Sequence, residues 1–348
     1  MFTIIFFLSS GLFLGWSLGA NDAANVWGTA VGTRMVQFKR AALTCSIFII
    51  LGAVISGSGA SHTLGKLGSI TTIAGAFTVA LAAALSVYWM TKLALPVSTS
   101  QAIVGAIVGW NIYAGTGINL SSLYKIMGTW VFSPVLTAAI AFLLYFLITL
   151  FLKKTNIHLI RLDGFTRTGL IVAGAFGSYS LGANNIANVM GVFTPTSPFN
   201  DLKIANLFTL SSVQQLFLLG GLAIAVGVFT YSKKVMMTVG ASIYKLSPIT
   251  AFIVVLSSSV VLFLFASEGL QLFLISHGLP SFPLVPVSSS QSIVGGVIGI
   301  SLAKKGRNVN YAILGRIALG WIATPVIAAV VSFVSLYFMQ NVFIQQVF

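Results

Sequence analysis

Acidic residues are almost absent from this sequence. Only four of its 348 residues are acidic, against 18 lysines and arginines, and charged residues make up 6% of the chain. Hydrophobic residues account for 57%, in apolar runs that repeatedly exceed the roughly 20 residues needed to cross a bilayer. This composition excludes a soluble globule and predicts an all-α polytopic membrane protein.

Cysteine and the common catalytic motifs are also missing. The single cysteine, Cys45, lies within an apolar run and excludes an intrachain disulfide. The chain has no H-E-x-x-H motif, no nucleophile elbow and no pair of carboxylates at catalytic spacing. Its three histidines, His62, His158 and His277, fall in predicted loops or at segment boundaries. We therefore expect no enzyme and no organic cofactor.

The basic residues that give a formal net charge of +14 lie between the apolar runs. This placement is typical of cytoplasmic loops beside anionic lipids, so we expect membrane lipids rather than nucleic acid as partners. The predicted location is the plasma membrane. Four basic clusters are predicted to be cytoplasmic: Arg34 to Arg40, Lys153 to Arg167, Lys233 to Lys245, and Lys304 to Arg307.

Ten apolar segments are expected to cross the membrane, five in each half. They are 1–31, 41–58, 71–92, 97–110 and 126–152, then 168–193, 204–231, 248–266, 287–303 and 312–340. Five crossings turn the second half upside down, which predicts an inverted-topology repeat with both termini outside. The repeats cover 1–152 and 168–348, joined by a cytoplasmic linker at 153–167. One segment of each half is too short for a straight span and is predicted to form a re-entrant hairpin.

A polar, glycine-rich motif occurs once in each half. Ser17–Gly28 reads SLGANDAANVWG, and Ser180–Gly191 reads SLGANNIANVMG. Glycine, asparagine and aspartate disfavour a helix interior, so both helices are expected to break here and to line a cavity. Asp22 is the only carboxylate in the two motifs, and at that depth it is a candidate cation ligand or proton carrier. The alternative is that Asp22 caps neighbouring N–H groups.

A second motif also occurs twice, as LPVSTSQAIVG in Leu95–Gly105 and VPVSSSQSIVG in Val285–Gly295. Its proline stops an arriving helix and its serines cap the next one. The free N–H groups and hydroxyls of two such helix starts predict a cradle for an oxyanion. The alternative is that the serines only cap kinked helices. The predicted anion-binding residues are Asn21, Asn25, Asn184, Asn188, Ser98, Thr99, Ser100, Ser288, Ser289 and Ser290.

A coupling cation is expected beside the anion. Carboxylate and amide oxygens are suitable cation ligands, and a bound Na+ at Asp22 and a proton carried by Asp22 both remain open. The residues assigned to the coupling ion are Asp22, Asn25, Asn185, Gln101 and Gln291.

The second half is longer than the first. The first motif recurs at an offset of 163 residues and the second at 190, so about 27 residues are gained between Gly191 and Pro286. We expect this insertion in the outward stretch 267–290, which contains Glu268 and His277.

The paired G-A-N-D-x-x-N and P-V-S-x-[ST] motifs resemble those of the inorganic phosphate transporter (PiT) family, which also includes sulfate permeases, across both halves of the chain. The resemblance implies an inverted-repeat fold, often dimeric, with an oxyanion between the broken helices and the Pro-Ser hairpins. It also implies transport driven by sodium or protons. Asn185 departs from the family by replacing the second aspartate, and Gln101 and Gln291 stand where histidine is common.

The predicted function is a secondary active symporter that imports phosphate, coupled to Na+ or H+ by alternating access, with a homodimer as the expected assembly. A sulfate permease is the alternative, because a carboxylate favours protonated phosphate and repels sulfate, whereas a site made of donors suits sulfate. A passive anion channel would use the same helix ends but needs a continuous wet path.

Overall fold

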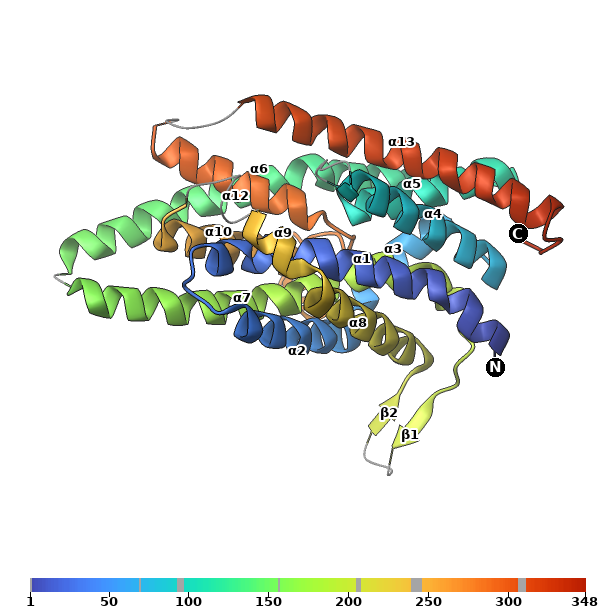
Figure 1. Ribbon diagram of the computed structural model, residues 1–348, viewed down its shortest axis with the longest axis horizontal. Coiled ribbons are helices and arrows are strands. Elements are labelled where there is room, and N and C mark those ends of the chain that lie inside the picture. Colours follow the sequence, from blue (N-terminus) through green and yellow to red (C-terminus); the bar gives the residue numbers. More distant parts are fainter. Residues whose placement is uncertain are drawn as a thin grey trace.

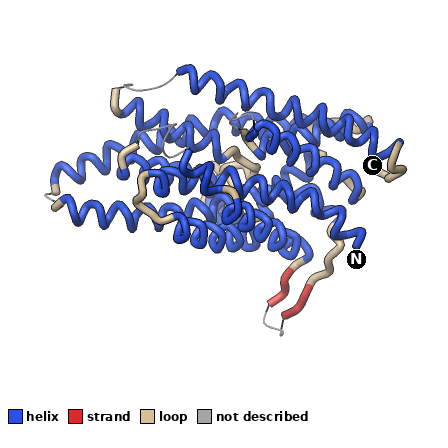
Figure 2. Tube along the Cα trace, viewed as in Figure 1, coloured by secondary structure: helices blue, strands red, loops and turns tan. Residues whose placement is uncertain are grey.

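A computed structural model shows a chain that is helical along most of its length (Figures 1 and 2). The described residues are 2–68, 70–92, 97–155, 157–204, 208–238, 246–305 and 311–348. Residues up to 154 form α1 (Phe2–Gly32), α2 (Phe38–Ser56), α3 (Ser58–Leu67), α4 (Ile73–Lys92), α5 (Thr99–Ala114) and α6 (Leu120–Lys154). The remainder forms α7 (Leu159–Met190), the 3-10 helix η1 (Gly191–Thr196), β1 (Leu202–Ile204), β2 (Phe208–Leu210), α8 (Ser212–Thr230), α9 (Ser232–Thr238), α10 (Pro248–Leu264), α11 (Glu268–Ser276), α12 (Ser289–Ala303) and α13 (Tyr311–Asn341).

Six helices in the described part of the chain are long and apolar enough to cross a membrane: α1, α2, α4, α6, α8 and α13. α10 and α11 meet at 69° and together count as a seventh span. α5 and α12 have 16 and 15 residues, fewer than the roughly 20 that a straight span needs. The all-helical, multi-span prediction is confirmed, but length and apolarity support fewer than ten crossings. α7 is long enough but carries serine, glycine and asparagine in its second half.

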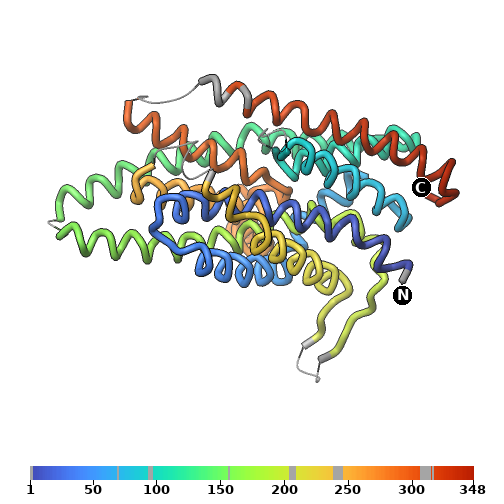
Figure 3. The backbone as a smooth tube through the Cα atoms, in the orientation of Figure 1, coloured from blue at the N-terminus to red at the C-terminus, as the bar shows by residue number. Residues whose placement is uncertain are grey.

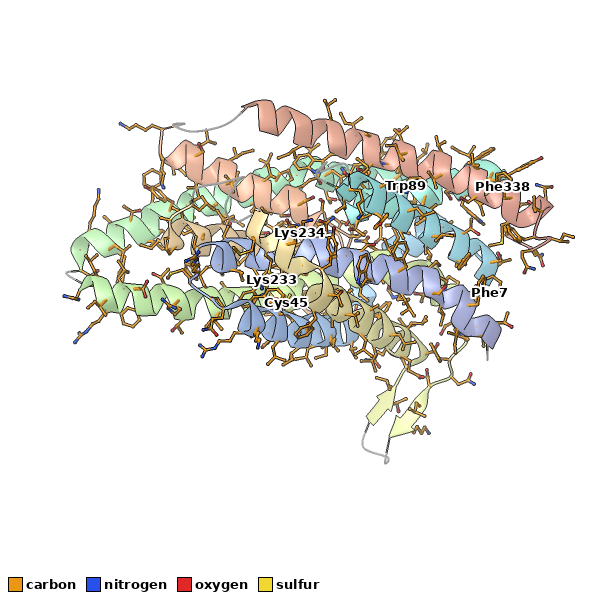
Figure 4. All side chains as sticks on the ribbon, in the orientation of Figure 1. Phe7, Cys45, Trp89, Lys233, Lys234 and Phe338 are labelled. Atoms are coloured by element: carbon orange, nitrogen blue, oxygen red, sulfur yellow. The ribbon has the colours of Figure 1, made fainter. Side chains whose placement is uncertain are left out.

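Both chain termini lie at one end of the elongated molecule, and the turn between α6 and α7 lies at the other (Figures 1 and 3). Two basic clusters come together near α9, where the Lys233 Nζ atom lies 5.8 Å from the centroid of the Phe38 ring (Figure 4). The Lys304 Nζ atom lies 5.9 Å from the Tyr145 ring centroid on α6. Lys245 and Arg307, also expected in these clusters, lie outside the described residues, as do Leu95 and Pro96 of the second motif.

The helices pack in equivalent pairs. α1 packs against α8 and α2 against α7, while α5 packs against α13 and α12 against α6. Glycines make the first two contacts close: a methyl group added at Gly19 would strike the backbone of Ile224, and one added at Gly182 would strike the backbone of Ile49. Each motif therefore lies on a helix that packs against the other part of the chain.

Both glycine-rich motifs are helical, so the predicted helix breaks are wrong. α1 continues through Ser17–Gly28, and α7 continues to Met190 before the 3-10 helix follows. A glycine inside a helix costs about 1 kcal/mol relative to alanine, but here the missing side chain permits backbone contact between helices. The asparagine amides bond to groups outside the backbone of their own helix, so they do not compete with its hydrogen bonds.

The extra length of the second half is divided between two places. Gly52 and Gly227 make equivalent backbone contacts with α7 and α1, at an offset of 175 residues. Since the motif offset is 163, about 12 of the extra residues precede α8, around the hairpin that pairs Leu202 with Leu210. The other 15 lie between α10 and α12, around α11. The expectation that the whole insertion lies in 267–290 is therefore wrong for the 12 extra residues that precede α8.

Candidate functional site

The second motif starts two helices as predicted. The Ser98 hydroxyl accepts a hydrogen bond from the Gln101 backbone N–H at 3.3 Å, and α5 begins at Thr99. The Ser288 hydroxyl accepts one from the Gln291 N–H at 3.3 Å, and α12 begins at Ser289. Both caps are 2% exposed, so two helix starts with their N–H donors lie inside the protein.

The copy of the glycine-rich motif on α7 contacts the start of α5. The Asn188 amide donates to the Ser100 hydroxyl at 2.8 Å and to the Asn185 amide oxygen at 2.8 Å. The Ser100 hydroxyl lies 3.2 Å from that Asn185 oxygen and 3.1 Å from the Val287 carbonyl oxygen. One hydroxyl proton serves one of these acceptors at a time. Both asparagines are fully buried and Ser100 is 1% exposed.

The motif of α1 makes a similar contact with the start of α12, one position earlier in the serine run. The Asn25 amide donates to the Ser289 hydroxyl at 3.0 Å, and the Asp22 carboxylate interacts with the same hydroxyl. Asp22 is 4% exposed, whereas Asn25 is partly exposed. Each motif helix thus meets the capped helix from the other part of the chain: α1 with α12, and α7 with α5.

The first asparagine of each motif holds a neighbouring segment. Asn184 accepts a hydrogen bond from the Val287 N–H at 2.7 Å and donates to the Val285 carbonyl at 3.0 Å, which fixes the segment before α12. Asn21 donates to the Thr91 hydroxyl at 2.8 Å at the end of α4. Val285, Val287 and Thr91 are site neighbours that sequence reasoning missed. Two of the three act through backbone atoms, for which side-chain identity gives no signal.

Several buried polar atoms have no partner among the described residues. They include the side-chain oxygens of Gln101 and Gln291, the Asn185 amide nitrogen and the Asn188 amide oxygen. An unpaired buried polar group costs about 1–3 kcal/mol, so such atoms call for an explanation such as a ligand. Two unpartnered oxygens at equivalent positions fit a cation, and an unpartnered amide nitrogen fits an anion.

The remaining predicted residues lie beside these contacts. Thr99 is buried in the first turn of α5, and the Ser290 hydroxyl lies 3.0 Å from that of Ser288. Among the described residues, no group of three or more His, Cys, Asp or Glu could hold a metal ion. A cation at Asp22 would therefore depend on neutral oxygens for its other ligands, which is a donor set that suits a monovalent ion better than zinc.

Fold and site together define the class: an all-helical, multi-span membrane protein with two paired polar motifs that meet in its interior. The chain matches the phosphate transporter family over residues 18–163, 153–332 and 279–347, and it belongs to that family. It is therefore a transporter and not an enzyme, and the resemblance read from its paired motifs is confirmed.

Relatives of the chain span nearly its whole length. A putative phosphate permease of Methanocaldococcus jannaschii is 27% identical and covers 92% of this chain and 93% of its own. The sulfate permease CysP of Bacillus subtilis is 29% identical, covering 92% and 84%. A solved structure titled "The sodium-dependent phosphate transporter" matches with a TM-score of 0.77 at 24% identity, over 98% of this chain and 99% of that one. The structural match supports the fold.

Proposed function

We propose that this protein is a secondary active symporter that imports a tetrahedral oxyanion, with phosphate as the preferred substrate. The observation that carries the proposal is the crossed contact between motifs and capped helices. Asn188 of α7 bonds to Ser100 of α5 at 2.8 Å, and Asn25 of α1 bonds to Ser289 of α12 at 3.0 Å. A transport site built from both parts of the chain can open to one side of the membrane and then to the other when the two parts move relative to each other.

The anion binds between the starts of α5 and α12. Their backbone N–H groups, the positive ends of their dipoles and the hydroxyls of Ser100 and Ser289 favour negative charge. The unpartnered amide nitrogen of Asn185 adds a donor. Serines that only capped kinked helices would not need asparagine partners on a third and a fourth helix, so these contacts favour binding over simple capping.

The coupling ion binds at or near Asp22. This carboxylate is 4% exposed in a membrane-spanning helix, where an uncompensated charge is costly. A sodium ion or a proton neutralises it, which makes loading of Asp22 a condition for closing the site. The buried oxygens of Gln101 and Gln291 are the neutral ligands that we assign to a sodium ion.

The two parts of the chain act as inverted repeats, residues 1–152 and 168–348, on either side of the linker 153–167. Equivalent packing of α1 on α8 and of α2 on α7 supports this division, as does the position of both termini at one end (Figure 1). The basic end is assigned to the cytoplasm and the end with the termini to the outside of the plasma membrane. A homodimer is the proposed assembly.

Sulfate is the second candidate substrate. Asn185 supplies an amide where an aspartate would supply a carboxylate, and a site rich in donors favours an anion that carries no proton. Asn185→Asp tests this distinction, because the mutant keeps an acceptor for the Ser100 hydroxyl and loses the free amide donor. We expect the ratio of sulfate to phosphate affinity to fall at least about tenfold, equivalent to about 1.4 kcal/mol. An unchanged ratio would contradict a role for residue 185 in selectivity.

Uptake into proteoliposomes tests the proposed function. An imposed sodium or proton gradient should drive labelled phosphate or sulfate against its own gradient, and a lack of uphill accumulation with either ion would indicate a channel. Asp22→Asn should abolish coupled uptake in a folded protein. The control is Asp163→Asn, because Asp163 is an exposed carboxylate whose partner is Arg167 at 3.1 Å. Full gradient-driven uptake by Asp22→Asn would remove Asp22 from the mechanism.

A further inference from the structure

A cavity of about 600 Å³ lies beside the end of α7. The β-hairpin that precedes α8, one of its lining helices, lies in the same half of the molecule as both termini (Figure 1). The end of α2, one face of α3, η1 and the first turns of α8 line it. At about 30 Å³ for each water molecule, this volume holds about 20 waters, so a hydrated oxyanion fits. None of the anion-binding residues assigned above lines this cavity.

α3 turns a polar face toward the cavity. Ser58, His62 and Lys66 follow one another at four-residue spacing and all line the cavity, as helix geometry requires of one face. A methyl group added at Gly65 would meet no atom within 4 Å, so this position faces open space. The opposite side of α3 is anchored, because the Thr63 hydroxyl donates to the Leu284 carbonyl at 2.6 Å.

Lys66 gives the cavity its charge. Its side chain is exposed, and no aspartate or glutamate is among the residues that line the cavity. Two carboxylates lie close to its rim: Glu268 accepts a hydrogen bond from Ser58 at 3.2 Å, and Asp201 accepts one from the Ser212 N–H at 2.8 Å. Neither carboxylate is among the lining residues, which leaves Lys66 as the lining residue with a full charge.

The cavity reaches the glycine-rich motif of α7. Gly191, the last residue of that motif, lines it. Asn188, which bonds to Ser100, precedes Gly191 by three residues, which is about 4.5 Å along a helix. A methyl group added at Gly191 would lie 3.3 Å from the Leu64 side chain. At Gly191 the cavity therefore lies next to a packed contact between α3 and the end of α7, about one helical turn from Asn188.

We propose that this cavity is an outer vestibule that binds the oxyanion before it enters the buried site, with Lys66 as the residue that attracts it. A charged cleft with low-dielectric walls raises the local concentration of ions of the opposite sign and their rate of association. The inference rests on the proposed function in that the anion held here is the transported one. Its test therefore includes a readout that does not depend on transport.

The test uses one cysteine placed in the vestibule. The native thiol, Cys45, is fully buried, so Gly65→Cys is expected to be the reactive position. The control is Gly117→Cys, in the turn before α6, where an added methyl group also meets nothing within 4 Å. Modification rates are measured with anionic and cationic methanethiosulfonate reagents in proteoliposomes, with the unsubstituted chain as the background.

We expect the ratio of anionic to cationic reaction rates to be about tenfold higher at position 65 than at 117, consistent with a local potential of a few kT. Adding Lys66→Gln should bring the ratio at 65 down to that at 117, and Lys66→Arg should keep it. Millimolar phosphate or sulfate should slow modification at 65 and leave 117 unchanged. Equal ratios at the two positions, or no protection by either anion, would overturn the vestibule.

Transport measurements separate the two proposals. If Lys66→Gln raises KM for anion uptake with kcat unchanged, the vestibule acts on binding, as proposed. If the ratio of anionic to cationic modification rates at position 65 is raised and phosphate or sulfate slows modification there, but neither anion is accumulated, the symporter proposal fails and the vestibule proposal stands. If uphill uptake is observed while the ratio is flat, the vestibule fails and the symporter stands.

Discussion

Gly105 and Gly295 permit close helix contacts beside the candidate site. A methyl group added at Gly105 would lie 2.6 Å from the Pro325 Cα atom of α13, and one added at Gly295 would lie 2.6 Å from the Pro134 Cα atom of α6. Ordinary van der Waals contact begins at 3.4 Å. The carbonyl oxygens of the same two prolines lie nearer still, so alanine at either position requires the two helices to separate by more than about 0.8 Å.

The magnitude follows from two opposing effects. Overpacking a tight contact costs about 1–3 kcal/mol, and the upper end applies because the neighbour is backbone and cannot change rotamer. Replacing glycine by alanine in a helix returns about 1 kcal/mol. The matched control is Gly128→Ala in α6, where an added methyl group meets nothing within 4 Å. Since the propensity gain is common to both changes, the difference between them is about 3 kcal/mol, the upper end of that range.

Unfolding of the purified variants in a fixed detergent measures this difference. We expect Gly105→Ala and Gly295→Ala to unfold at a lower temperature or denaturant concentration than the parent protein, by similar amounts. Gly128→Ala should be as stable as the parent protein or more stable. If Gly105→Ala matches Gly128→Ala, the close α5–α13 contact is refuted. If only one of the two close-contact variants is destabilised, the two contacts are not equivalent, which contradicts the paired arrangement.

Three further variants test the site. Asn184→Ala leaves the Val285 carbonyl and the Val287 N–H unpaired and buried. Its loss of stability should be about 1–3 kcal/mol larger than that of Asn341→Ala, because the carbonyl partner of Asn341 is exposed. Equal losses of stability would contradict the role of burial. Ser100→Ala should reduce anion uptake by about tenfold or more at unchanged yield of folded protein, which corresponds to one lost charge-assisted hydrogen bond of about 1.5–3 kcal/mol; full activity would exclude its hydroxyl as a ligand. Gln101→Leu should weaken the stimulation of anion binding by sodium without lowering sodium-free binding, and unchanged stimulation would remove Gln101 from the cation site.

Some features of the site follow from local chemistry and were predictable. Serine after proline marks a helix start because its hydroxyl accepts an N–H in the first turn, and Ser98 and Ser288 do this at 3.3 Å. Apolar runs predict membrane helices because water is absent from the bilayer core. The cap involves residues within one helical turn and the apolar run is one continuous segment, so neither prediction needs contacts between distant residues.

Other features depend on contacts between distant residues. Gly19 and Gly182 were predicted to break their helices, because a local rule counts only the cost of glycine in a helix. The structure gives each of them a backbone neighbour, Ile224 and Ile49, some 205 and 133 residues away. The offset between repeated motifs gave the total length of the insertion but not its division, because a difference of two positions does not say where residues were added between them.

The crossed contacts explain why one difference between the motifs has consequences for the whole site. The two contacts are of the same kind, because an asparagine amide meets a serine hydroxyl at 2.8 Å in one and 3.0 Å in the other, although the two serines differ by one position in the repeat. Asp22 and Asn185 occupy the same position in the two motifs, 163 residues apart, so the negative charge lies on one side only. Only one of the two motifs has a carboxylate. A cation would neutralise the charge of Asp22, whereas Asn185 offers an amide donor at the same position of the other motif. In the proposed function, coupling depends on Asp22 and anion selectivity on Asn185, and the substitutions at residues 22 and 185 test the two roles separately.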